Sequence, residues 1–91
     1  MLPIFDWNDE NRKHIAKHRV TPAEAEQAVL NDPIDLTLQV GEGEERIVQV
    51  GAIDKGRILL VVTTWRKDKI RVVTAYPAPK QLREFYLQNT S

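Results

Sequence analysis

The chain has 91 residues, 42% of them hydrophobic, and this length and composition predict one small domain over residues 1–91 with a single thin core. Its 13 Lys and Arg balance 13 Asp and Glu, and this zero net charge argues against a protein that coats nucleic acid indiscriminately. The chain has no cysteine, which excludes disulfides, a thiolate nucleophile and zinc–thiolate sites.

The first third of the chain predicts a short strand and two helices. Residues 3–7, "PIFDW", have the pattern of a strand, and residues 8–18 predict a helix that Asn8 caps. The run "TPAE" is a capping box in which Glu24 reaches back to the N-cap threonine. A second helix is therefore expected over residues 21–30.

The rest of the chain changes from helical to strand periodicity and ends in a third helix. Alternating apolar residues between short turns predict four consecutive strands, over 34–40, 46–53, 57–65 and 69–76. The last helix is expected over 79–88, with core positions at Leu82, Phe85 and Tyr86. The order β-α-α-β-β-β-β-α, with an antiparallel sheet packed by helices, defines an α+β fold.

The last strand carries cations on one of its faces. Strict alternation groups Lys69, Arg71, Val73 and Ala75 against Ile70, Val72, Thr74 and Tyr76. We therefore expect a sheet whose helices cover one face, while part of the other face is open to a charged partner.

Charge is divided unevenly along the chain. Residues 1–45 hold four Lys/Arg against ten Asp/Glu, and residues 46–91 hold nine against three, so the halves carry −6 and +6. The densest cluster runs from Arg66 to Arg71. It has two interpretations, a solvated hairpin end whose charges prevent edge pairing or a surface that meets phosphates.

Nothing in the sequence indicates a membrane protein. No run approaches the roughly 18 apolar residues of a membrane helix. The start, "MLPIFDW", has neither the basic residues nor the long apolar stretch of a secretory signal. We expect a cytoplasmic protein.

The two histidines and two tryptophans each have several interpretations. His14 and His18 are four residues apart on one helix face, where they could grip a metal, pack under a loop, or serve catalysis. No third metal ligand is nearby in sequence, so no metal site is predicted. Trp7 and Trp65 are interpreted as packing residues, and Trp65 also as a partly exposed stacking platform.

Two motifs resemble the BrnT-type toxin family over nearly the whole chain. The first, "NxxHIxxH-x-V-T-P-x-E", is formed here by Asn11, His14, Ile15, His18, Val20, Thr21, Pro22 and Glu24. The second is the sheet segment "T-x-R…I-R-V-x-T-A", preceded by an Arg-led strand that closes on glycine, "RIVQVG". The resemblance implies a RelE-like ribonuclease fold.

The resemblance also implies a function. The chain would be the toxin of a type II toxin–antitoxin system, a metal-independent endoribonuclease that needs no cofactor and inhibits translation. Its partners would be RNA and a small antitoxin, which contacts operator DNA. Such an enzyme needs a base near the 2′-hydroxyl, cations for the phosphorane charge and an acid for the leaving 5′-oxygen.

These needs select the candidate site residues. Catalysis is assigned to Arg46, Arg66, Arg71, His18 and Tyr86, with His14 as a further proton carrier. RNA contacts are assigned to Arg57, Lys69, Tyr76, Lys80 and Arg83. Tyr86 has a second interpretation as a buried structural tyrosine, because it shares the core spacing of its helix.

Two departures from the family pattern affect these expectations. Tyr76 stands where family members usually carry an arginine, so an alternative function is a catalytically degenerate member that binds and regulates through its antitoxin. Arg19 stands where a glycine commonly ends the first helix, so a left-handed C-cap there would be strained or absent. A third hypothesis is an unrelated structural adaptor with the same α+β fold.

Overall fold

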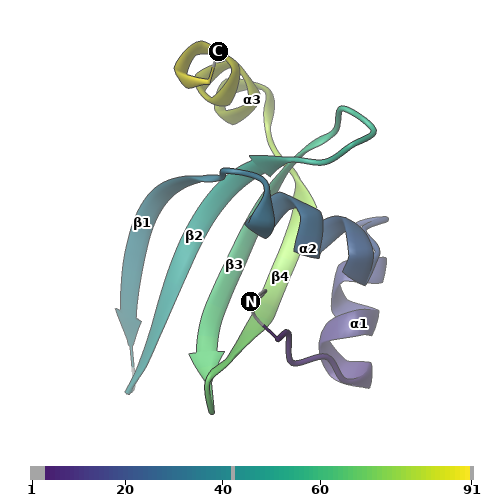
Figure 1. Ribbon diagram of the computed structural model, residues 1–91, viewed down its shortest axis with the longest axis vertical. Helices are drawn as coiled ribbons and strands as arrows, with labels where there is room; N and C mark the ends of the chain where they lie inside the picture. Colours follow the sequence, from purple (N-terminus) through teal and green to yellow (C-terminus); the bar gives the residue numbers. More distant parts are fainter. Residues whose placement is uncertain (1–3, 42, 91) are drawn as a thin grey trace.

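Three helices and one four-stranded antiparallel sheet make up the computed structural model, which describes residues 4–41 and 43–90 (Figure 1). Strands that are consecutive in the chain are neighbours in the sheet, in the order β1-β2-β3-β4. The α+β class and the element order are confirmed apart from the first strand. The bounds are α1 Asp9–Ala16, α2 Pro22–Leu30, β1 Ile34–Gly41, β2 Glu44–Ala52, β3 Ile58–Arg66, β4 Lys69–Pro77 and α3 Lys80–Asn89.

The predicted first strand is reduced to a single parallel bridge between Phe5 and Ile70. Ile70 donates its N–H to the carbonyl of Ile4 at 2.9 Å and accepts from the N–H of Asp6 at 2.8 Å. The chain then turns away to begin α1, which leaves too few residues for a ladder. Pro3, the first residue of the predicted strand, lies outside the described residues.

Helices α1 and α2 both begin with a capping box; the sequence predicted the box at Thr21, and for α1 it predicted only Asn8 as the N-cap. The Asn8 side chain accepts from the Asn11 backbone N–H, and the Asn11 side chain accepts from Asn8 N–H at 2.8 Å. In α2 the Glu24 carboxylate accepts from Thr21 N–H at 3.0 Å. Each box satisfies backbone donors that a helix N-terminus otherwise leaves unpaired.

The left-handed turn after α1 is present although an arginine occupies it. Arg19 has φ of 60°. Val20 N–H bonds the Ile15 carbonyl at 3.2 Å and Arg19 N–H bonds the Ala16 carbonyl at 3.0 Å, which is the Schellman pattern. The turn therefore keeps its hydrogen bonds and places a side chain where glycine is favoured.

The main core lies between the helices α1 and α2 and what we call the first face of the sheet, the face that carries Leu59 and Val61. In Figure 1, α2 crosses in front of β3 and β4 and α1 runs beside β4. The buried residues of this core are Ile15, Val20, Ala25, Ala28, Ile53, Leu59, Val61, Val72 and Ala75. Trp7 packs against the cluster and donates its indole N–H to Glu26 at 2.8 Å.

A β-bulge in β4 changes the expected alternation of its side chains. Val62 pairs with Thr74 and Thr63 with Val72, so Val73 is an extra residue on β4. Val72 and Ala75 consequently face the same core, whereas strict alternation had placed them on opposite faces. That alternation was wrong beyond Val72 for this reason.

A second core lies where α3 packs across one end of the sheet. Val50, Ile58, Ala78 and Tyr86 are buried there, and Leu82 packs against them. Phe85 is 40% exposed, so its predicted place in the core was wrong. The helix buries only the stripe through Leu82 and Tyr86, and Phe85 lies to the side of it. Among the described residues, no helix is both long enough and apolar enough to cross a membrane.

Candidate functional site

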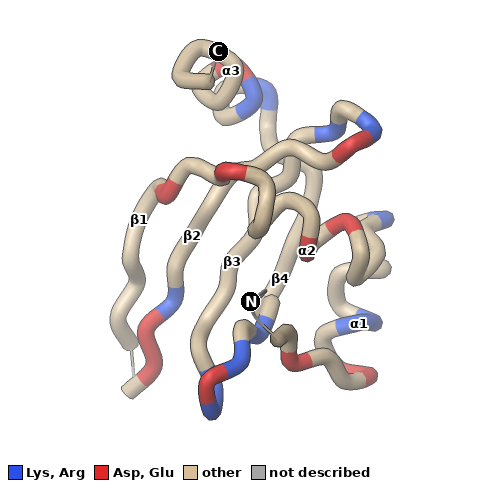
Figure 2. Tube along the Cα trace, viewed as in Figure 1, with Lys and Arg blue, Asp and Glu red and all other residues tan. Residues whose placement is uncertain are grey.

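A cleft of about 680 Å³ opens on the second face of the sheet, beside α1. Figure 2 shows basic segments at the β3–β4 turn, on the neighbouring part of β2 and on α1. Arg46, Arg66 and Arg71 line this cleft, which we call the arginine cleft, and Lys13 and Lys17 of α1 line its other side. The cleft therefore gathers cations from four elements.

Strand register explains why the three arginines meet. Thr64 of β3 pairs with Arg46 of β2 on one side and with Arg71 of β4 on the other. Cross-strand partners point to the same face, and Arg66 follows Thr64 by two residues, so it shares that face as well. Three adjacent strands thus present one arginine each.

The β3–β4 hairpin turns in only two residues. Lys67 and Asp68 have φ of 53° and 65°, the conformation of a type I′ turn. This turn pairs Arg66 with Lys69, which is exposed at the hairpin end. Lys69 therefore lies next to Arg66 on the same face, at the rim of the sheet.

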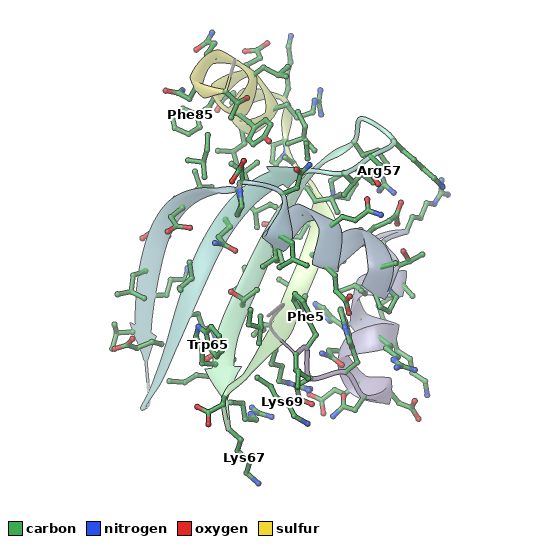
Figure 3. The ribbon with its side chains drawn as sticks, viewed as in Figure 1. Phe5, Arg57, Trp65, Lys67, Lys69 and Phe85 are labelled. Atoms are coloured by element: carbon green, nitrogen blue, oxygen red, sulfur yellow. The ribbon has the colours of Figure 1, made fainter. Side chains whose placement is uncertain are left out.

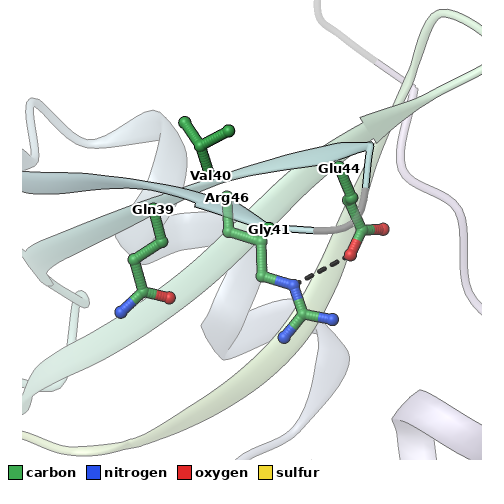
Figure 4. Close-up of a pocket in the computed structure, with 5 residues that line it drawn as sticks. All are labelled: Gln39, Val40, Gly41, Glu44 and Arg46. Atoms are coloured by element: carbon green, nitrogen blue, oxygen red, sulfur yellow. Dashed lines mark hydrogen bonds and ion pairs between the residues drawn. The ribbon is translucent and has the colours of Figure 1, made fainter.

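Glu44 holds two of the three arginines. Its carboxylate lies 2.9 Å from Arg46 Nε and 3.7 Å from Arg66 Nη2. The Arg46 pair is drawn in Figure 4. Both guanidinium groups are substantially exposed, and exposed ion pairs contribute only about 0–1 kcal/mol. Replacement of this carboxylate by an incoming anion therefore costs little free energy.

Arg71 differs from the other two because it is only 6% exposed. Its Nη2 donates to the Asn8 side chain at 3.2 Å, and its Nη1 lies 3.7 Å from the Asp6 carboxylate. Within the described residues this buried Nη1 has no hydrogen-bond partner. Arg71 therefore links the N-terminal segment and the α1 cap to β4, and its buried guanidinium group lines the cleft.

The two histidines lie on the α1 side of the cleft. His14 lines it and shares a hydrogen bond with Thr74, Nε2 to Oγ1 at 3.0 Å. The His14 and His18 ring centres are 5.8 Å apart, and His18 lies 5.6 Å from the Tyr76 ring. The three rings form a row that leads away from the arginines. In residues 4–41 and 43–90 no group of three His, Cys, Asp or Glu is placed to hold a metal ion.

Arg57 does not join the cleft. Its Nη1 lies 3.2 Å from the Glu24 carboxylate and donates to the Arg19 carbonyl at 3.1 Å, so it links the residue before β3 to α2 and to the turn after α1. The pKa of Glu24 is lowered, first by the hydrogen bond from Thr21 N–H and then by the Arg57 charge, which together outweigh the effect of burial. These contacts give Arg57 a structural role.

The α3 residues also lie elsewhere, at the end of the sheet opposite the β3–β4 turn (Figure 1). Arg83 donates to the Ala78 carbonyl at 3.0 Å, and Lys80 is exposed in the first turn of the helix. Tyr86 is buried in the second core. The structure thus brings the three arginines together with His14, and it separates them from Lys80, Arg83 and Tyr86.

Sequence reasoning missed the α1 lysines and Glu44. Glu10, Lys13, His14 and Lys17 all line the cleft and follow the i, i+3, i+4, i+7 spacing of one helix face. This spacing was the signal that could have identified them as one functional helix face. Glu44 gave no comparable signal, because its partners become neighbours only through the sheet register.

Comparison with known proteins gives one match. Residues 7–81 match the family model described as "Ribonuclease toxin, BrnT, of type II toxin-antitoxin system". This range covers more than half of the chain and contains every residue that lines the arginine cleft. No curated protein and no solved structure matches the chain, so the likeness to RelE-type folds stays a prediction.

Proposed function

The chain belongs to the family of BrnT ribonuclease toxins of type II toxin–antitoxin systems, and from this premise we propose that it is a metal-independent endoribonuclease that uses the arginine cleft. Cleavage of RNA would inhibit translation in the cytoplasm. The observation that supports the proposal best is the convergence of Arg46, Arg66 and Arg71 from three adjacent strands on one face. Convergent cations suit a phosphate backbone.

The proposed reaction is attack by a ribose 2′-oxygen on the adjacent phosphorus, with loss of the 5′-oxygen. Negative charge on the phosphoryl oxygens rises in the transition state, and preorganised cations stabilise it. We assign direct phosphate contact to Arg46 and Arg66, which are exposed and released when the phosphate displaces Glu44. Arg71 raises the local potential from beneath, where its contacts fix its position.

Proton transfer is assigned to the histidine pair. The reaction needs a base for the 2′-hydroxyl and an acid for the 5′-oxygen, and histidine is the side chain that most often serves either role. His14 lines the cleft and His18 lies next to it. The burial of Tyr86 in the second core favours its structural interpretation.

We assign contact with an RNA base to Tyr76, the aromatic ring that follows the two histidines in the row. Tyr76 packs beside His18, where an unpaired base could stack. Stacking on an aromatic side chain is worth about 1–3 kcal/mol for each base and tolerates any sequence. Lys69 would extend the phosphate track at the rim of the sheet.

Expression of the chain alone in bacterial cells, followed by an RNA gel, tests the proposal. The wild type is expected to stop growth and fragment RNA, and Arg46→Ala with Arg66→Ala is expected to do neither. Arg12→Ala is the matched control, because Arg12 is an exposed α1 arginine outside the cleft lining. Equal RNA fragmentation by the double variant would refute the assignment of the cleft.

A second candidate function is an antitoxin-binding module without catalysis. Tyr76 favours it, because a tyrosine cannot supply the charge of the arginine that the family pattern leads us to expect there. This candidate predicts a folded protein that binds its antitoxin and leaves growth unaffected. A gain of toxicity on Tyr76→Arg would support it, and absence of any gain would count against it.

A further inference from the structure

An apolar patch lies on the first face of the sheet where α1 and α2 do not reach. Its members are Leu38, Val40, Ile47 and Trp65, and Leu38, Val40 and Trp65 are 56%, 73% and 60% exposed. Figure 3 shows Trp65 near the β3 end of this uncovered area. The register groups these residues, because Leu38 pairs with Ile47 and Val40 pairs with Glu45. Exposed apolar clusters of this kind mark interaction surfaces.

The outer edge of β1 borders the patch and has no strand beside it within the described residues. A bulge at Leu36 interrupts the start of the strand, which leaves the backbone of residues 37–41 as the regular free edge. Proteins usually protect such edges with lysine, proline or a covering segment. Residues 37–41 contain neither lysine nor proline, and the main helix–sheet packing among the described residues is on β2, β3 and β4.

Charge indicates what kind of segment fits this surface. The charged side chains that β1 and β2 present on the first face are Asp35 and Glu45, and both are acidic. A second copy of the chain would bring more acidic groups to this face. A segment with Lys or Arg between apolar residues would complement it, since opposite charges on neighbouring strands are favourable.

We propose that residues 37–41 and the apolar patch dock an extended segment of the antitoxin, which adds a strand to β1 and carries alternating apolar and basic side chains. Main-chain hydrogen bonds would supply affinity and the alternate side chains specificity. The proposal rests on the antitoxin partner that the family implies. It does not depend on RNA cleavage at the arginine cleft.

The surface is also connected to the arginine cleft. A hollow of about 530 Å³ at the end of the β1–β2 hairpin is lined by Gln39, Val40, Gly41, Glu44 and Arg46 (Figure 4). Glu44 and Arg46 line the cleft as well. An antitoxin segment anchored on residues 37–41 can continue through this hollow and bring a carboxylate to Arg46. Docking at the edge and occlusion of the cleft would then be one binding event.

The test measures, by calorimetry, binding of the full chain to its cognate antitoxin. The variant Leu38→Lys with Val40→Lys places charge on the exposed edge without disturbing either core. It is expected to bind the antitoxin at least about tenfold more weakly, the loss typical of a central apolar contact. Leu87→Lys, at an exposed leucine of α3, is the matched control and is expected to bind within about twofold of wild type.

Hydrogen exchange on the wild-type complex provides an independent result. The amides of residues 37–41 that point outward are expected to become protected when the antitoxin binds, because strand addition gives them partners. Unchanged exchange there, or unchanged affinity of the edge variant, would overturn the proposal. The proposal would also be overturned if the wild-type chain alone forms a dimer and the edge variant is a monomer, because the surface would then bind a second copy of the chain.

RNA cleavage by the free edge variant separates this proposal from the proposed function. The variant residues lie outside the arginine cleft, so its cleavage rate is expected to equal that of wild type. If the wild type does not cleave RNA and the edge variant still loses antitoxin binding, the docking surface stands and the enzymatic proposal fails.

Discussion

Gly51 lies where the backbone of β2 meets α2, and we predict that Gly51→Ala destabilises the fold by about 2–3 kcal/mol. An added Cβ would lie 2.3 Å from the Ala28 carbonyl oxygen and 3.3 Å from the Pro33 Cβ. Close carbon–oxygen contacts are normally about 3.3 Å, so α2 would have to move by about 1 Å. That movement would open the packing around Ala25 and Ala28, which are fully buried.

Thermal unfolding followed by circular dichroism measures this cost. One kcal/mol corresponds to about 4–8 °C in a domain of this size, so a loss of about 2–3 kcal/mol should make Gly51→Ala melt roughly 8–24 °C below wild type. Gly41→Ala is the control, because a Cβ there meets nothing within 4 Å and its φ is not left-handed. If both variants melt close to wild type, α2 does not approach β2 as closely as the structure places it.

Three further changes test the end of α1, an acidic contact and the cleft. Arg19→Gly should raise the free energy of unfolding in urea by about 1 kcal/mol, because it relieves a left-handed residue, and Arg19→Ala should not. The pKa of Glu24 is lowered from its ordinary 4.5, chiefly by the Thr21 N–H, so its stabilising contribution is present above that value and lost as pH falls below it. Wild type should therefore lose more stability than Glu24→Gln between about pH 6 and pH 3 in thermal melts. Glu44→Gln should bind a 2′-deoxy, non-cleavable RNA about two- to fivefold more tightly in fluorescence anisotropy, because an exposed ion pair competing for Arg66 is removed.

Each of these predictions has a result that contradicts it. Equal stabilisation by Arg19→Gly and Arg19→Ala would place the effect in the side chain and not in the backbone. If wild type and Glu24→Gln lose the same stability as the pH falls, protonation of Glu24 does not cause the acid destabilisation. Weaker RNA binding by Glu44→Gln would show that the carboxylate positions the arginines and does not compete for them.

Local signals explain how much of the fold could be predicted from the sequence. The Asn8 N-cap, the capping box at Thr21 and the short turn between β3 and β4 depend only on residues near one another in the chain, and all three were found as expected. The bulge at Val73 could not be predicted, because no residue type there signals an insertion into the ladder. The bridge at Phe5 depends on a partner 65 residues away, which local pattern cannot supply.

The candidate site divides in the same way. Arg66 and Arg71 follow from one tight hairpin, so their proximity could be predicted from sequence. The position of Arg46 beside them depends on the β2–β3 register. The α1 lysines reach the cleft because Asn11 anchors the helix to the edge of β4, through its side-chain amide and the Val72 carbonyl at 3.1 Å. That docking is tertiary, and the sequence pattern alone did not indicate it.

Incubation of the purified chain with a synthetic RNA in the presence of EDTA tests the central claim most directly. The account predicts that wild type and Arg12→Ala cleave the RNA at similar rates. It predicts a loss of about 100-fold or more for Arg46→Ala with Arg66→Ala, the scale of removing preorganised transition-state contacts. Cleavage that disappears with EDTA, or that continues at the wild-type rate in the folded double variant, would contradict it.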